Sequence, residues 1–209
     1  MRLLALLMLC VLLLAATGGA GATSEPGPRI LVLGDSISAA YGVPLEAGWV
    51  ARLRDRLDAE GYSHQVINAS VSGDTTSGGL ERLPAALERH SPVVVVIELG
   101  GNDGLRGLSP EAMRSNLDGM VRKAREAGAR VLLLGVRLPP NYGPAYTRQF
   151  TRVFRDVAQR HDIALAPRIL EGVGEETELM QEDGIHPDDR GHARILATVW
   201  PRLEPLLAE

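Results

Sequence analysis

Five short, mostly apolar segments recur along the chain and are separated by longer segments of mixed polarity. The apolar segments are residues 30–34, 65–69, 93–99, 130–136 and 163–166. Runs of this length without regular alternation are typical of strands that are buried on both faces, as in a parallel sheet. Residues 93–99 are the longest nearly unbroken run, so we expect them to form the central strand.

Between these segments, apolar residues recur at helical spacing. In residues 46–60 they are Trp49, Val50, Leu53 and Leu57. Further helices are expected at residues 80–90, 109–127, 146–161 and 191–206, and polar loops at 70–79, 138–144 and 172–191. Pro84 is expected in or directly after the first turn of its helix. The alternation of strands and helices predicts a three-layer α/β/α sandwich with a five-stranded parallel sheet of the flavodoxin-like type.

Polar or glycine residues follow the carboxyl end of most of the predicted strands. Ser36 follows the first strand, Gly73 the second and Asn102 the third, and Asp183 and His186 lie in the loop after the fifth. The carboxyl ends of parallel strands share one edge of a sheet, where open α/β folds bind their ligands. We therefore expect these five residues to lie close together.

A serine, a histidine and an aspartate at one edge are the groups that acyl transfer requires. The Ser36 hydroxyl needs a base within hydrogen-bonding distance, and His186 is suited to accept its proton while Asp183 orients the imidazole. The tetrahedral oxyanion needs fixed donors. The backbone amides of Ser36 and Gly73 and the side chain of Asn102 are candidates for that role.

Each of these features also has a simpler explanation. Asp35 and Ser36 are both good helix caps, and Gly73 suits a tight turn. Asn102 is of a type that often caps a helix, and His186 fits an exposed loop. Taken singly, each site favours the simpler explanation, whereas their occurrence at successive strand ends favours catalysis.

A metal site is the other chemical alternative. Its ligands would be Asp35, Asp103, Asp183 and His186, which would leave the serine and the asparagine without a role. We expect no metal and no cofactor. The other histidines are expected at the surface or at helix ends: His64, His90, His161 and His192.

Length and composition limit the possible functions. The chain has 209 residues, a net charge of -4 and 45% hydrophobic residues, which suits one domain with its own core. An acidic chain without a cluster of Lys and Arg binds nucleic acid poorly, and 4% aromatic residues provide no base-stacking surface. We therefore expect no nucleic-acid partner.

The amino-terminal residues have the pattern of a cleaved export signal. Arg2 precedes an apolar stretch at residues 3–16, and Ala20-Gly21-Ala22 matches a signal-peptidase site. We predict a signal peptide at 1–22, a linker at 23–29 and a single domain at 30–209. An uncleaved anchor is the alternative. Cleavage predicts a periplasmic or secreted protein without stable membrane insertion.

Cys10 is the only cysteine and lies within the predicted signal peptide. Lipid attachment at this residue is disfavoured, because Leu9 stands where such sites resemble one another in having Gly or Ala. Cleavage would leave a mature chain without a thiol, which excludes a cysteine nucleophile, a disulfide and zinc bound by cysteine.

Four sequence blocks together resemble the SGNH (GDSL) hydrolase family. They are residues 34–38 (Gly-Asp-Ser-Ile-Ser), 68–75 (Asn-Ala-Ser-Val-Ser-Gly-Asp-Thr), 98–107 (Glu-Leu-Gly-Gly-Asn-Asp-Gly-Leu-Arg-Gly) and 183–187 (Asp-Gly-Ile-His-Pro). The resemblance covers essentially the whole mature chain. Residues 137–143 are also similar to a loop of the family's bacterial periplasmic thioesterase/lysophospholipase/arylesterase subgroup.

The resemblance implies Ser36 as nucleophile, His186 as base with Asp183 as its partner, and Gly73 and Asn102 as oxyanion donors. It also implies an acyl-binding groove formed by Leu105, Leu108, Leu138, Pro139 and Tyr142. Ala40 departs from the family pattern, since many relatives carry glycine there, and its methyl group is expected to affect the mouth of the groove.

The predicted function is that of a cofactor-free, monomeric serine esterase acting on small-molecule acyl esters or thioesters. A carbohydrate O-acetyl esterase is the alternative within the enzyme class. A non-catalytic flavodoxin-like binding module is the alternative outside it.

Overall fold

The five predicted strands form one parallel sheet at the centre of the molecule. The computed structural model describes residues 27–208. The strands are β1 (Arg29–Gly34), β2 (Gln65–Asn68), β3 (Val94–Glu98), β4 (Arg130–Leu134) and β5 (Ala164–Ala166). Their order is β2-β1-β3-β4-β5, which is the flavodoxin-like order, and the winding direction changes between β1 and β3. Gly34 of β1 pairs with Glu98 of β3, so the loops that follow these two strands start side by side.

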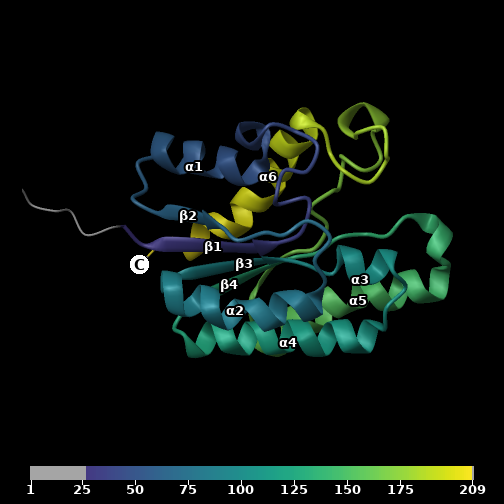
Figure 1. The fold of residues 1–209 in the computed structure, drawn as a ribbon, viewed down its shortest axis with the longest axis horizontal. Coiled ribbons are helices and arrows are strands. Elements are labelled where there is room, and N and C mark those ends of the chain that lie inside the picture. Colours follow the sequence, from purple (N-terminus) through teal and green to yellow (C-terminus); the bar gives the residue numbers. More distant parts are fainter. Residues whose placement is uncertain (1–26, 209) are drawn as a thin grey trace, which may run out of the picture.

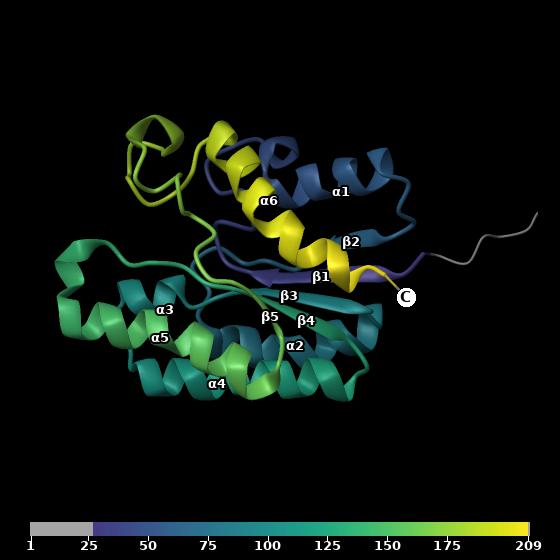
Figure 2. The same cartoon turned by 180° about the vertical axis from the view of Figure 1, so that it is seen from behind.

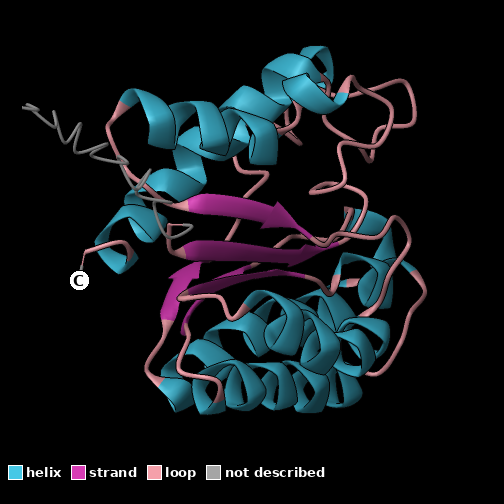
Figure 3. Cartoon of the chain, turned by 60° about the vertical axis from the view of Figure 1, so that its left-hand side comes forward, coloured by secondary structure: helices cyan, strands magenta, loops and turns pink. Residues whose placement is uncertain are grey.

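Helices cover both faces of this sheet and complete the three predicted layers. α1 (Trp49–Ala59) and α6 (Asp189–Leu203) lie on one face (Figures 1 and 2). α2 (Thr76–His90), α4 (Pro110–Glu126) and α5 (Pro144–His161) lie on the other, with the short helix α3 (Gly101–Leu105) directly after β3. Figure 3 shows the sheet between the two helical layers. Single 3₁₀ turns occur at Leu45–Ala47, Pro140–Tyr142, Thr177–Leu179 and Glu204–Leu206.

The two central strands are buried on both faces, which explains their unbroken apolar sequences. Residues 30–33 of β1 and 94–97 of β3 are each 0% exposed. The helical spacing of residues 46–60 also identifies the correct face, because Trp49, Val50, Leu53 and Leu57 are all buried in α1. The three-layer α/β/α prediction is therefore confirmed.

The start of α2 differs from the prediction. The helix begins at Thr76 rather than at residue 80, so the glycine pair at 78–79 is helical and Pro84 lies well inside the helix, beyond its first turn. Two contacts explain the early start: the Thr75 side chain caps the helix, and Asp103 accepts a hydrogen bond from the Thr76 amide at 2.8 Å. The second contact joins residues 27 positions apart, so local sequence signals do not reveal it.

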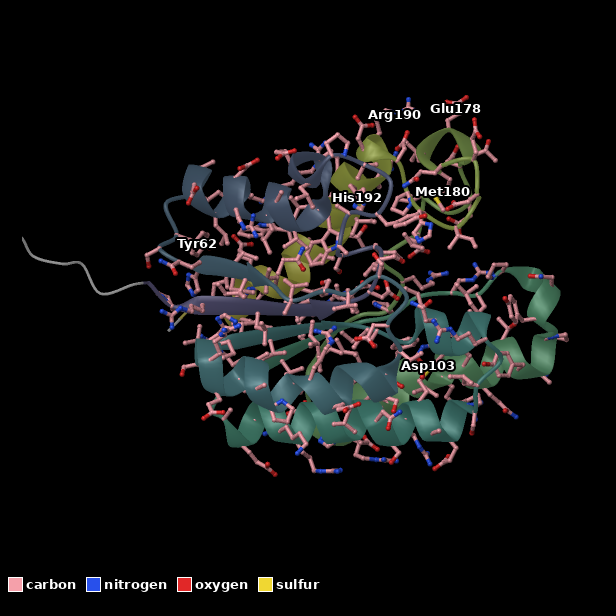
Figure 4. All side chains as sticks on the ribbon, in the orientation of Figure 1. Tyr62, Asp103, Glu178, Met180, Arg190 and His192 are labelled. Carbon is pink, nitrogen blue, oxygen red and sulfur yellow. The ribbon has the colours of Figure 1, made fainter. Side chains whose placement is uncertain are left out.

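Smaller differences occur at three other helices. α1 begins at Trp49 rather than at residue 46, because Gly48 has an extended backbone that separates the helix from the 3₁₀ turn before it. Asn102 and Asp103 lie in the short helix α3, which the sequence did not predict. His192 lies near the amino-terminal end of α6, in agreement with the expected position at a helix end, but it is 0% exposed (labelled in Figure 4).

The predicted signal peptide and Cys10 lie outside the described residues, as does most of the predicted linker. Within residues 27–208, no helix is both long enough and apolar enough to cross a membrane.

Candidate active site

Three predicted residues form one hydrogen-bonded chain at the carboxyl edge of the sheet. The Ser36 hydroxyl lies 2.9 Å from Nε2 of His186, although the two residues are 150 positions apart in the sequence. Nδ1 of His186 lies 2.6 Å from Oδ2 of Asp183. These two distances are within the range of a hydroxyl, a general base and an orienting carboxylate.

Asp183 is held in its charged form. Its partial burial would raise its pKa, but hydrogen bonds from the His186 ring and from the amides of His186 and Ile185 lower that pKa to about 2. The two amides donate to Oδ1 at 3.0 and 2.9 Å, while Oδ2 contacts the ring. A carboxylate that stays ionised favours the tautomer of His186 with the proton on Nδ1, which leaves Nε2 able to accept a proton.

The loop that carries His186 is fixed by two further residues. The Gln181 side-chain amide donates to the carbonyl groups of Tyr41 and Pro187 at 2.8 and 2.9 Å, and the Gln181 backbone amide donates to the His186 carbonyl at 2.8 Å. The ring centroids of Tyr41 and His186 are 4.7 Å apart. Gln181 therefore connects the His186 loop to the segment that follows Ser36.

The three predicted oxyanion donors lie at the ends of β1, β2 and β3. Gly73 has a φ of +79°, a left-handed conformation that disfavours side chains. The backbone amides of Ser36 and Gly73 donate no hydrogen bond to another described residue. The Asn102 side-chain amide donates to Asp35 Oδ2 at 3.1 Å with one of its two hydrogens.

Two arginines hold the loop that carries Gly73. Arg106 donates to the Gly73 carbonyl at 2.7 Å. Arg82 donates to Oδ2 of Asp74 at 2.7 Å and to the Gly34 carbonyl at 3.1 Å. These contacts tie the loop after β2 to α2, to α3 and to the end of β1.

A cavity of about 300 Å³ opens beside this cluster. Leu105, Leu138 and Pro139 line it as predicted, whereas the lining residues do not include Leu108 or Tyr142. The Tyr142 hydroxyl instead donates to the Leu105 carbonyl at 3.0 Å, and the Leu108 side chain is 43% exposed. Further apolar lining residues, absent from the prediction, are Ile37, Val136, Leu170, Met180 and Ile185.

Sequence reasoning assigned no catalytic role to several polar residues around this site. They are Asp35, Ser38, Tyr41, Glu98 and Gln181. One sequence signal was available for Glu98, because a single acid at the end of an otherwise apolar buried strand must have a polar partner. The partners of Gln181 and Tyr41 depend on loop geometry that the sequence does not show.

The metal alternative has no support in the described residues. No group of three or more His, Cys, Asp or Glu residues between 27 and 208 is arranged to hold a metal ion. Asp103, one of the four proposed ligands, is 3% exposed and binds Thr76 instead.

Comparisons with known proteins identify the family. Residues 32–194 match the sequence profile of the GDSL-like Lipase/Acylhydrolase family. The chain is 57% identical over 178 residues to the "Esterase TesA" of Pseudomonas aeruginosa, which covers 85% of this chain and 89% of that protein. It is 40% identical over 178 residues to the "Thioesterase 1/protease 1/lysophospholipase L1" of Escherichia coli, covering 85% and 84% of the two chains.

A solved structure agrees with these sequence relatives. The crystal structure of TesA matches with a TM-score of 0.84 at 56% identity, covering 85% of this chain and 99% of that one. The chain therefore belongs to the GDSL-like lipase/acylhydrolase family, and it is a serine esterase.

Proposed function

We propose that Ser36 is the nucleophile of this esterase, that His186 is its general base, and that Asp183 orients and stabilises the imidazole. The observation that carries the proposal is the chain of two short contacts from Ser36 Oγ through His186 to Asp183, at 2.9 and 2.6 Å. Ser36 follows β1, whereas Asp183 and His186 share the loop between β5 and α6, so the sheet edge brings together two segments that are distant in the sequence.

The reaction proceeds in two displacements. His186 takes the Ser36 proton as the hydroxyl oxygen attacks the ester carbonyl, and then gives that proton to the departing alcohol or thiol. In the second step water attacks the acyl-Ser36 intermediate and gives a proton to His186. His186 returns that proton to Ser36 Oγ as the bond between the acyl carbon and Oγ breaks and the carboxylic acid leaves. The amides of Ser36 and Gly73 and the Asn102 side chain donate to the oxyanion in both steps, and each donor contributes about 3 kcal/mol.

The cavity beside Ser36 favours an acyl chain as substrate. Ile37 and Ile185, the neighbours of Ser36 and His186, both line it, so the reacting carbonyl and the cavity adjoin each other. A volume of about 300 Å³ exceeds the needs of an acetyl group, and the lining is mainly apolar. The proposed substrates are fatty-acyl esters, fatty-acyl thioesters and lysophospholipids, rather than O-acetylated sugars.

Covalent labelling tests the nucleophile. A fluorophosphonate probe is expected to label the wild-type protein at Ser36, and the variants Ser36→Ala and His186→Ala should show no labelling. Ser77→Ala is the matched control, because Ser77 is an exposed serine on α2 for which no hydrogen bond to Ser36, His186 or Asp183 occurs, and its loss should not affect labelling. Labelling of Ser36→Ala at the wild-type rate would refute the assignment.

A hydrolysis panel tests the substrate class. Octanoyl or longer p-nitrophenyl esters, together with matching thioesters, should give a higher kcat/KM than acetyl esters. Leu170→Trp should shift the preference to shorter chains because Leu170 lines the cavity, whereas Leu108→Ala should leave the preference unchanged. A clear preference for acetyl esters in the wild-type protein would favour the O-acetyl esterase.

We also propose that the protein is exported, that its signal peptide is cleaved after Ala22, and that the mature protein is a monomer. The sequence pattern of residues 1–22 is the support for this proposal. Amino-terminal sequencing of the protein recovered from the periplasm or the medium should begin at Thr23. Size-exclusion chromatography with light scattering should give the mass of a single chain.

A further inference from the structure

Two carboxyl groups lie buried beside Ser36, and the proposed reaction does not use either of them. Asp35 is 3% exposed and Glu98 is 1% exposed. They are at the carboxyl ends of two strands that pair through Gly34 and Glu98. Burying carboxyl groups costs free energy unless hydrogen bonds compensate, so a pair at this position needs an explanation beyond packing.

Glu98 is held by donors on one of its oxygens. Its Oε2 accepts hydrogen bonds from the Ser38 hydroxyl at 2.8 Å and from the Asp35 amide at 3.3 Å. The Trp49 indole donates in turn to the Ser38 hydroxyl at 3.2 Å. Burial, and then the negative charge of Asp35, raise the pKa of Glu98 well above its usual value. Glu98 therefore favours its protonated form more strongly than Asp35 does, and in that form it donates a hydrogen bond to Asp35.

Asp35 faces donors on both of its oxygens. Burial also raises the pKa of Asp35, but hydrogen bonds from Ile37, Glu98 and Asn102 all favour its carboxylate. Oδ1 accepts from the Ile37 amide at 3.1 Å, and Oδ2 accepts from Nδ2 of Asn102 at 3.1 Å. Gly101 permits this approach, because a side-chain carbon there would lie only 3.3 Å from Oδ2.

The contact with Asn102 determines how that side chain is oriented. A carboxylate can only accept, so the NH₂ group of Asn102 must face Asp35 and the carbonyl oxygen must point elsewhere. One N–H is then occupied by Asp35, and the second is available to an oxyanion. The contact with the Ile37 amide fixes, in the same way, the turn that carries Ser36.

From this geometry we infer that Asp35 is a positioning residue for ester hydrolysis. Its carboxylate, braced by Glu98, orients the Asn102 amide as a donor and holds the backbone that carries Ser36. The inference rests on the proposed role of Asn102 as an oxyanion donor. Asp35 itself does not touch the substrate.

The decisive variant is Asp35→Asn, which preserves size and removes the charge. Its amide can still accept from the Ile37 N–H through the oxygen, but its NH₂ group then faces Asn102. Asn102 must rotate to present its carbonyl oxygen to residue 35, and its NH₂ group leaves the position required for the oxyanion. We expect kcat to fall about 100-fold, similar to the loss of one oxyanion donor, with KM little changed.

A double-mutant cycle separates positioning from simple stabilisation. If Asp35 acts through Asn102, then Asp35→Asn should lower kcat little further in a protein that already carries Asn102→Ala. Glu98→Gln should retain kcat close to the wild-type value, since its amide can accept from Ser38 and donate to Asp35. Asp118→Asn is the matched control: it is a buried acid on α4 that binds Arg160 and His161, and it should change stability without changing kcat.

Two outcomes would overturn the inference. One is a wild-type kcat in Asp35→Asn, and the other is a full multiplication of the two losses in the double variant. Ser36→Ala, measured in parallel, distinguishes the failure of this inference from that of the proposed function. An inactive Ser36→Ala beside a fully active Asp35→Asn refutes only the role of Asp35, whereas an active Ser36→Ala refutes the proposed nucleophile itself.

Discussion

Two acidic side chains near Ser36 lie in opposite electrostatic settings. Asp183 lies on a loop, its side chain is 39% exposed, and its pKa is lowered to about 2. Glu98 lies at the end of a central strand, is 1% exposed, and has a pKa raised well above its usual value. Asp183 therefore acts as a charged acceptor, whereas Glu98 acts as a neutral donor.

The difference shows that the surroundings, and not the residue type, decide what a carboxyl group does here. Asp183 receives two backbone N–H bonds and the His186 ring, which together favour its charge. Glu98 is enclosed by the core and faces a second carboxyl group, which disfavours its charge. Asp183, which stays charged, is thus suited to stabilise an imidazole whose charge changes during the reaction. Glu98, which favours its neutral form, is suited to hold its neighbours in a fixed geometry.

The largest effect on kcat is expected from a substitution of Asp183, the exposed acid. Asp183→Asn should lower kcat by about 10⁴-fold, because the asparagine amide would favour the wrong tautomer of His186. The free energy of unfolding should change by less than about 1 kcal/mol, since the side chain is partly exposed. Steady-state kinetics and chemical denaturation measure the two quantities. Glu182→Gln, an exposed neighbour, is the control and should match the wild type in both.

Substitution of Glu98, the buried acid, should affect the free energy of unfolding more than kcat. Glu98→Ala removes a hydrogen-bonded group from the core and leaves the Ser38 hydroxyl and the Asp35 amide without their acceptor. It should lower the free energy of unfolding by about 4 kcal/mol. Glu98→Gln should cost far less, as it keeps the acceptor and the shape. Equal destabilisation by the two variants in urea denaturation would contradict the hydrogen-bonding account.

The sign of the pH dependence also separates Glu98 from its glutamine variant. A pKa raised in the folded state means that the wild type loses stability as pH rises above 4.5, the value of an unperturbed glutamate. Glu98→Gln does not titrate, so its stability relative to the wild type should increase between pH 4.5 and neutrality. A constant difference over this range would show that Glu98 is ionised in the folded protein.

His192 extends the buried polar network and titrates with the opposite sign. Its Nδ1 accepts from the Trp49 amide at 3.3 Å, and burial, followed by the charge of Arg52, lowers its pKa from 6.5 to about 4. The unfolded chain thus binds a proton that the folded protein excludes. Stability should fall by about 3 kcal/mol as pH decreases from 6.5 to 4.

The variant His192→Asn tests whether His192 causes the loss of stability between pH 6.5 and 4. Its amide oxygen can accept from the Trp49 N–H, and it has no charge to gain on acidification. The loss of stability between pH 6.5 and 4 should therefore shrink, while the loss below pH 3.8 that belongs to Asp183 should persist. An unchanged acid profile between pH 6.5 and 4 would assign that window to other groups.

The sequence was sufficient for features that depend on local patterns. The apolar runs of β1 and β3 predicted a buried parallel sheet because helices cover both faces of these strands. Ser36, Gly73, Asn102, Asp183 and His186 could be placed at one edge because parallel strands end together. The structure brings Ser36, His186 and Asp183 into one hydrogen-bonded chain at that edge.

Features that depend on contacts between distant segments were not predictable. The bond from Thr76 to Asp103 starts α2 four residues early, although Gly78 and Gly79 disfavour a helix by themselves. Leu108 and Tyr142 lie on the segments that follow β3 and β4, but they do not line the cavity, because the path of each segment sets the direction of its side chains. The contact between Asp35 and Asn102 was likewise not predictable, because it joins residues 67 positions apart.

Substitution of Ala40 gives the smallest predicted effect. It is 6% exposed and has a φ of +58°, a conformation that favours glycine. Its methyl group packs beside Gly48, and the residues that line the cavity do not include it. Ala40→Gly removes backbone strain but increases the freedom of the unfolded chain, so we expect a net gain of about 0.5 kcal/mol in unfolding free energy. The acyl-length preference should stay as in the wild type in the ester panel. A shift towards longer chains would instead show that this methyl group limits the mouth of the groove.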